Sequence, residues 1–166
     1  MSCKGFASRI KMSAAFPARA RFSRPAGEYK LVTVPQILNT AKEVSQFRVN
    51  MGAIDFTEEI LEGLPEVKGD LNQLADSCFN LISNAYDAVQ RKATESDPNP
   101  FKGKIWVRGR TEKKDGRTWV VMEFQDNGTG ITPQEMESLF IPFFTTKATV
   151  QKGTGLGLYV IRRIVE

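Results

Sequence analysis

The feature that most constrains the fold is the stretch 70–90, DLNQLADSCFNLISNAYDAVQ. Three polar side chains, Asn80, Asn84 and Asp87, recur on one side of it at helical spacing. At about 100° per residue, the apolar residues form a single stripe on roughly the opposite side, which predicts a long amphipathic helix packed on a core. The stripe consists of Leu71, Leu74, Ala75, Cys78, Ile82, Ala85 and Val89.

The amide row on this helix indicates a binding face. Asparagine is a mediocre helix former because its side chain competes for backbone hydrogen bonds. A row of such residues on a strong core helix therefore favours a face that binds a polar ligand. From this stretch alone, a simply solvated helix face is an equally good interpretation.

The chain before this helix is predicted to alternate short strands and a helix. Pro35 suits a first helical turn, because the N–H that it lacks has no partner there anyway. The spacing predicts an extended segment over 30–34, a helix from Pro35 to about Val49 that Gly52 ends, and a strand over 53–60. Asp70 is the expected N-cap of the long helix.

After the helix, residues 104–112 and 118–125 read as two strands joined by a tight hairpin, because Lys114-Asp115-Gly116-Arg117 carries the Asp-Gly turn signal. Asp126 then stands at the exit of the second strand. The connection 131–152 contains one short predicted helix, over 133–139 with Thr132 as N-cap, and its length is typical of a functional lid.

Three sequence blocks follow the amide-bearing helix in order. They are Asp126-Asn127-Gly128-Thr129-Gly130, the stretch FIPFFTTK over 140–147, and GTGLGL over 153–158, which opens the last predicted helix. With the helix, they resemble the N, G1, F and G2 boxes of the ATP-binding catalytic domain of bacterial sensor histidine kinases. A single glycine motif would be weak evidence, but four blocks in order are specific. The resemblance covers about residues 22–166.

The resemblance implies an α+β two-layer sandwich, in which helices cover one face of a mixed β-sheet (the Bergerat, or GHKL, fold). Residues 29–166 would form the catalytic domain. Residues 1–28 would be a basic, irregular tail or linker remnant. Because relatives continue into further strands beyond the last helix, we expect that this sequence is truncated at its C-terminus and lacks those strands.

The resemblance also assigns roles on the long helix. Asn84 matches the metal-binding asparagine, and its amide oxygen is the kind of hard ligand that Mg²⁺ prefers. Asn80 would contact phosphate or ordered water, and Asp87 would contribute to the nucleotide site. The alternative for Asn80 is a helix-to-loop hydrogen bond.

At the strand exit, Asp126 would recognise the exocyclic amine of adenine, because an ionised carboxylate only accepts hydrogen bonds. This would favour ATP over GTP. Gly128 and Gly130 would let the backbone turn and approach the base closely. Without the resemblance, a plain Asp-Asn-Gly turn is the simpler interpretation.

The phosphates would bind where the last helix begins, since backbone N–H groups and the positive end of a helix form an anion site. Neither the P-loop nor the Rossmann spacing is present. The lid would add phosphate contacts when closed, although Lys147 could equally be solvated. The residues expected at the phosphates are Gly153, Thr154, Gly155, Leu156 and Gly157, with Thr145, Thr146 and Lys147 from the lid.

The 166 residues contain no histidine. A kinase of this type needs a phosphoacceptor histidine, so we identify no catalytic residue in this chain. The expected partners are a phosphoacceptor (dimerisation) domain, separate or missing, and a downstream response regulator. A membrane would be reached only through missing parts. The alternatives are a non-catalytic nucleotide-binding module, another ATPase of the superfamily, or a protein kinase of the mitochondrial type.

Composition sets the remaining bounds. A chain of 166 residues, 41% of them hydrophobic, fits one domain with a core. The net charge of +4 comes mostly from the tail. The tail could be a transit peptide or a basic arm for nucleic acid, but we favour an artefact of fragmentation. The sequence therefore indicates no clear nucleic-acid partner. Two cysteines, with Cys78 on the apolar stripe, favour a reducing compartment and hence a cytoplasmic location.

Overall fold

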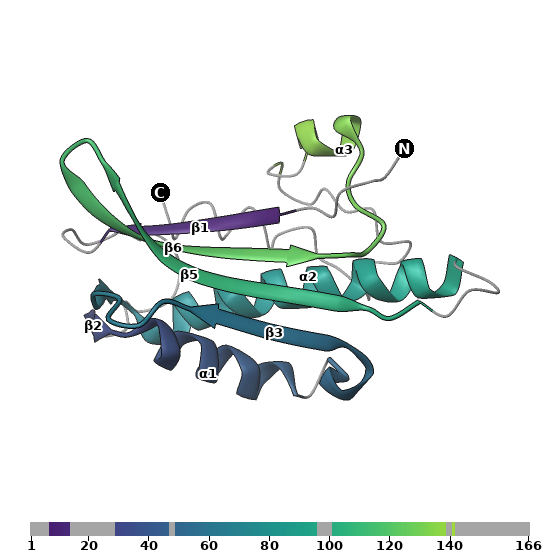
Figure 1. Cartoon of the computed structure of the whole chain (residues 1–166), viewed down its shortest axis with the longest axis horizontal. Coiled ribbons are helices and arrows are strands. Elements are labelled where there is room, and N and C mark those ends of the chain that lie inside the picture. The colour runs from purple at the N-terminus through teal and green to yellow at the C-terminus, as the bar shows by residue number, and fades with distance from the viewer. Residues whose placement is uncertain (1–6, 14–28, 47–48, 96–100, 139–140, 142–166) are drawn as a thin grey trace.

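The computed structural model of the chain describes residues 7–13, 29–46, 49–95, 101–138 and 141. They form two layers, a β-sheet on one side and the helices α1 and α2 on the other, as predicted (Figure 1). In chain order the elements are β1 (Ala7–Ser13), β2 (Lys30–Val32), α1 (Val34–Ser45), the 3-10 turn η1 (Met51–Ala53), β3 (Asp55–Ile60), β4 (Val67–Gly69), α2 (Leu71–Glu95), β5 (Lys104–Lys114), β6 (Arg117–Asp126) and α3 (Pro133–Ser138).

The main sheet is mixed, with strand order β1-β6-β5-β3. Strand β6 is antiparallel to both β1 and β5, and β5 is parallel to β3, while β2 and β4 form a separate antiparallel pair. At the β5–β6 turn, Asp115 and Gly116 have φ values of 53° and 71°. Positive φ at both central residues is what a type I′ turn requires, so the predicted hairpin is confirmed.

Two expectations about local structure differ from the observed fold. The structure forms strand β1 within the tail that we expected to be irregular, pairing Ala7 with Gln125 and Ser13 with Trp119. This pairing satisfies backbone groups of β6 and needs no hydrophobic pattern, so composition gave no sign of it. Helix α1 ends at Ser45 and not near Val49, although the Val49 N–H still donates to the Ser45 carbonyl at 2.8 Å.

The core lies between the helices and the sheet. All members of the predicted α2 stripe are buried except Leu71, which is half-buried and packs against this core. The sheet contributes Val107, Val120, Met122 and Phe124. Cys78 is a free thiol inside this core, and burial raises its pKa to about 12.

Helix starts follow the predicted capping chemistry. The Oδ1 atom of Asp70 accepts the backbone N–H groups of Asn72 at 2.9 Å and Gln73 at 3.1 Å, so Asp70 is the N-cap of α2. At α3, Thr132 and Glu135 exchange backbone-to-side-chain hydrogen bonds in a capping box. Among the described residues, no helix has both the length and the apolar character needed to cross a bilayer.

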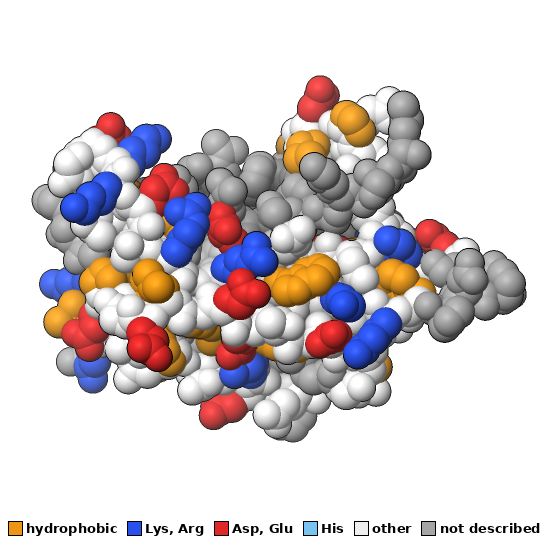
Figure 2. Space-filling model, viewed as in Figure 1, with side chains coloured by type: hydrophobic (Ala, Val, Ile, Leu, Met, Phe, Trp, Pro, Cys, Tyr) orange, Lys and Arg blue, Asp and Glu red, His pale blue; other side chains and the backbone are white. Residues whose placement is uncertain are grey.

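The sheet face directed away from the helices is charged. Arg108 contacts Glu59 at 2.7 Å and Arg110 contacts Glu123 at 3.2 Å, so these side chains pair with those of neighbouring strands. Acidic and basic side chains are interspersed across the surface in Figure 2. Such exposed pairs stabilise a fold only slightly.

Candidate functional site

The amide residues of α2 lie along its half-buried side. Asn80, Asn84 and Asp87 are all half-buried, whereas the apolar stripe faces the core. Asn84 precedes Ala88 by one helical turn and Lys92 by two. These last two residues contact the turn that follows β6, so the amide row leads along the helix towards that turn.

Asp126 ends β6 on the helix-facing side of the sheet, since side chains alternate and Phe124 lies in the core. The residue is only 7% exposed, and its Oδ1 atom accepts the N–H of Gly128 at 2.8 Å. Burial raises the Asp126 pKa, while the Gly128 hydrogen bond and the charges of Lys92 and Arg91 act to lower it. Within the described part of the chain, Oδ2 accepts no hydrogen bond, so it can take a donor from a ligand.

The turn after β6 is in direct contact with α2. A Cβ atom at Gly128 would meet the Ala88 carbonyl carbon at 2.5 Å and the Ala88 Cβ at 2.7 Å. The Thr129 N–H donates to the Ala88 carbonyl oxygen at 3.2 Å. Gly130 has φ +76°, a conformation that favours glycine. The space that glycine leaves at 128 is thus occupied by the helix.

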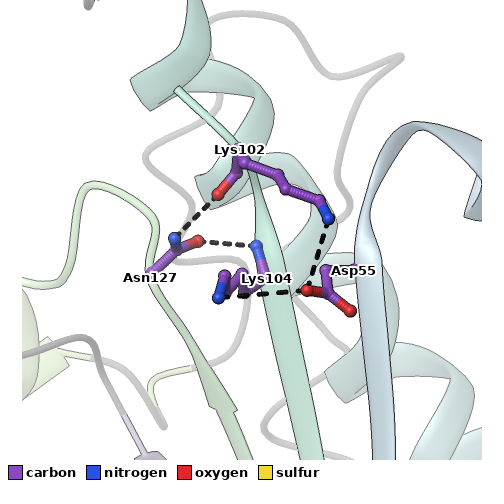
Figure 3. A network of polar contacts seen from close by, with 4 residues as sticks. All are labelled: Asp55, Lys102, Lys104 and Asn127. Atoms are coloured by element: carbon purple, nitrogen blue, oxygen red, sulfur yellow. Dashed lines mark hydrogen bonds and ion pairs between the residues drawn. The ribbon is translucent and has the colours of Figure 1, made fainter. Parts of the chain in front are cut away.

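Sequence reasoning missed the role of Asn127, which joins this turn to the start of β5 (Figure 3). Its Oδ1 accepts the Lys104 N–H at 2.8 Å, and its Nδ2 donates to the Lys102 carbonyl at 3.0 Å. The ammonium groups of Lys102 and Lys104 lie 3.6 and 3.9 Å from an Asp55 carboxylate oxygen, which extends the network to β3. The only available signal was the habit of Asn to bond nearby backbone in turns.

Lys92 was missed as well. Its Nζ donates to the Asn127 carbonyl at 2.8 Å and lies 5.1 Å from the centre of the Phe101 ring. Lys92 and Ala88 are four residues apart on α2, so two successive turns of the helix contact the same loop. Nearby, the Thr129 Oγ1 is buried and has no hydrogen-bond partner among the described residues.

The structure therefore brings together one part of the predicted site. The α2 side carrying Asn84 continues into the contacts with the turn of Asp126, Gly128 and Gly130. Among the described residues, the second oxygen of the Asp126 carboxylate and the buried Thr129 hydroxyl have no hydrogen-bond partner. The phosphate residues predicted at 145–147 and 153–157 lie outside the described residues.

A family model described as "Histidine kinase-, DNA gyrase B-, and HSP90-like ATPase" matches residues 69–166. The sensor histidine kinase ZraS of Salmonella typhi is 36% identical over 105 residues, which cover 63% of this chain and 19% of that protein. The sensor kinase CckA of Brucella abortus is 34% identical over 142 residues, covering 80% of this chain and 14% of that protein. The chain thus spans about a fifth or less of these relatives.

Solved structures resemble the same fold. A nucleotide-free catalytic domain of the histidine kinase ThkA superposes with a TM-score of 0.59 at 26% identity, covering 84% of this chain and 82% of that one. The mycobacterial sensor histidine kinase MprB superposes with a TM-score of 0.57 at 24% identity, covering 82% of this chain and 78% of that one. The second likeness concerns the fold alone.

Proposed function

Because the chain belongs to the family of histidine kinase-, DNA gyrase B- and HSP90-like ATPases, we propose that it is the ATP-binding catalytic domain of a two-component sensor histidine kinase. The domain comprises residues 29–166 together with β1 (Ala7–Ser13), which pairs with β6 in the same sheet. It transfers the γ-phosphoryl group of ATP to a histidine of a phosphoacceptor domain, which then phosphorylates a response regulator. Since these 166 residues contain no histidine, the acceptor lies outside them.

The observation that carries this proposal is the Asp126 carboxylate, buried at the end of β6 with Oδ1 bonded to Gly128. Its Oδ2 accepts the exocyclic amine of adenine, whereas the carbonyl of guanine at that position would be repelled. Gly128 and Gly130 shape the turn around the base. The site therefore selects ATP through a charged acceptor held in a region of low polarity.

The triphosphate follows α2 away from the base. The Asn84 amide oxygen would hold Mg²⁺, with Asn80 and Asp87 contacting phosphate or its ordered water. When bound, Mg²⁺ neutralises triphosphate charge. By their sequence, the glycine-rich block and the lid supply the remaining phosphate contacts, namely Gly153, Thr154, Gly155, Leu156 and Gly157 with Thr145, Thr146 and Lys147.

The chain's contribution to the reaction is positioning. A neutral imidazole nitrogen is already nucleophilic near neutral pH, so the domain needs no general base of its own. Backbone donors and the amide face of α2 orient the γ-phosphoryl group towards the acceptor. The buried, free Cys78 supports a reducing, cytoplasmic setting.

Calorimetry with Mg-ATP and Mg-GTP tests the assignment on the wild type and on Asp126→Asn. We expect ATP to bind in preference to GTP, and Asp126→Asn to bind ATP at least about tenfold more weakly, because a hydrogen bond to a charged group contributes about 1.5–3 kcal/mol. Asp115→Asn, at the distant β5–β6 turn, is the matched control and should bind like the wild type.

A folded sample that takes up no ATP, or an Asp126→Asn variant with unchanged affinity, would refute the proposed site. Incubation with radiolabelled ATP and a purified histidine-bearing phosphoacceptor domain tests the transfer itself. Binding of ATP without phosphohistidine formation would favour the alternative of a nucleotide-binding regulatory module.

A further inference from the structure

Lys92 occupies an unusual position between three segments. It belongs to the last turn of α2, is half-buried, and donates to the Asn127 carbonyl at 2.8 Å. Its ammonium also lies 5.1 Å from the centre of the Phe101 ring, within the range of a cation–π contact. Holding a lysine side chain in one place has an entropic cost, so contacts from two directions indicate a defined location.

The ammonium also acts on the buried carboxylate next to Asn127. Among the described residues, the charged groups that act on Asp126 are Lys92 and Arg91, both from α2, and Lys92 has the larger effect. The residue opposite Asp126 on β5 is Ile105, which is fully buried and apolar. Arg91 is exposed to solvent. Of the cations in the described part of the chain, Lys92 thus does most to offset the cost of burying the Asp126 charge.

We propose that Lys92 is a positioning residue of the nucleotide site: its ammonium fixes the Asn127 peptide by a hydrogen bond to the carbonyl and, by its charge, holds the neighbouring Asp126 carboxylate in place for a purine amine. This inference rests on the proposed function, because Asp126 is there the acceptor for adenine. Lys92 acts through Asn127 and Asp126 and not by touching the nucleotide.

A consequence concerns selectivity. A charged carboxylate accepts hydrogen bonds only, whereas a protonated carboxyl group can also donate one to the carbonyl of guanine. Loss of Lys92 should raise the pKa of Asp126 further, since its main compensating charge is gone. Discrimination between ATP and GTP should then weaken as the pH falls, and it should do so at a higher pH than in the wild type.

The test compares Lys92→Gln with Lys92→Arg, which keeps the charge, and with Lys113→Gln, which removes the same charge from the exposed end of β5. Dissociation constants for Mg-ATP and Mg-GTP are measured by calorimetry from about pH 5 to about pH 8. We expect ATP affinity of Lys92→Gln to decline at a higher pH than that of the wild type, with about a threefold to tenfold loss at the lower end. Lys92→Arg should restore most of it, and Lys113→Gln should match the wild type.

A direct titration separates this inference from the proposed function. Carboxyl carbon NMR of Asp126 in nucleotide-free protein should show a higher midpoint in Lys92→Gln than in the wild type. Phe101→Leu, which keeps the Lys92–Asn127 contact, should shift the midpoint in the same direction by less. This variant replaces Lys92→Gln in the titration if Lys92→Gln does not fold. An unchanged midpoint, or an ATP affinity lowered equally at every pH, would overturn the inference. Absence of ATP binding by the wild type would instead refute the proposed function.

Discussion

Replacing Asn127 with alanine tests whether the turn after β6 is fixed by its side chain. The substitution removes two hydrogen bonds, to the Lys104 N–H at 2.8 Å and the Lys102 carbonyl at 3.0 Å. The first is partly buried, and we assign it about 1–1.5 kcal/mol; the second is exposed and can be replaced by water, so we assign it about 0.5 kcal/mol. The free energy of unfolding should therefore fall by about 1.5–2 kcal/mol.

Urea denaturation of the full chain measures this loss as a lower midpoint at unchanged slope. Asn127→Asp keeps an acceptor for the Lys104 N–H and loses only the donor to Lys102, so its loss should be smaller than that of alanine. Asn72→Ala changes the same residue type on the exposed first turn of α2 and should stay within about 0.5 kcal/mol of the wild type. If Asn127→Ala is no more destabilising than Asn72→Ala, the reasoning about this turn is wrong.

Three further predictions follow from burial and close approach. Gly128→Ala would place its Cβ 2.5 Å from α2 backbone and should cost about 1–3 kcal/mol of stability in a urea melt, whereas Gly52→Ala, with its nearest contact at 3.4 Å, should cost far less. Burial raises the Asp126 pKa, so the native state binds a proton there more tightly than the unfolded chain does. The free energy of unfolding of the wild type, measured relative to that of Asp126→Asn, should therefore fall as the pH rises above the ordinary pKa of 3.8. A constant difference across pH would contradict this. In a Cys3→Ser background, the buried Cys78 should react with a thiol reagent only on unfolding; rapid reaction of the native protein would argue against its burial.

The elements that the sequence predicted well are those set by local chemistry. The α2 stripe, the Asp70 cap and the Asp115-Gly116 turn each depend on residues within a few positions of one another, and all three are confirmed. The position of Asp126 at the end of β6 followed from strand alternation. Its role at the base came from the family resemblance and stays a prediction.

The features that were missed depend on residues far apart in the sequence. Nothing in the pattern of α2 marks Ala88 as the residue that accepts the Thr129 N–H, because a small apolar side chain on a helix is usual in any core. Nor does the pattern mark Lys92, whose hydrogen-bond acceptor, the Asn127 carbonyl, lies 35 positions further along the chain. Their roles follow only once β6 is laid beside α2, which local periodicity does not specify.

The pairing of β1 with β6 has a consequence for the order of assembly. Ala7 and Gln125 are on the order of a hundred positions apart, so closing that loop is entropically costly, whereas the β5–β6 hairpin closes through two residues. The hairpin should form early and the first strand should dock last. In amide hydrogen exchange, the hydrogen bonds between β1 and β6 should therefore be the first in the sheet to open, so their amide protons should exchange first. The amide protons bonded between β5 and β6 should be retained longer.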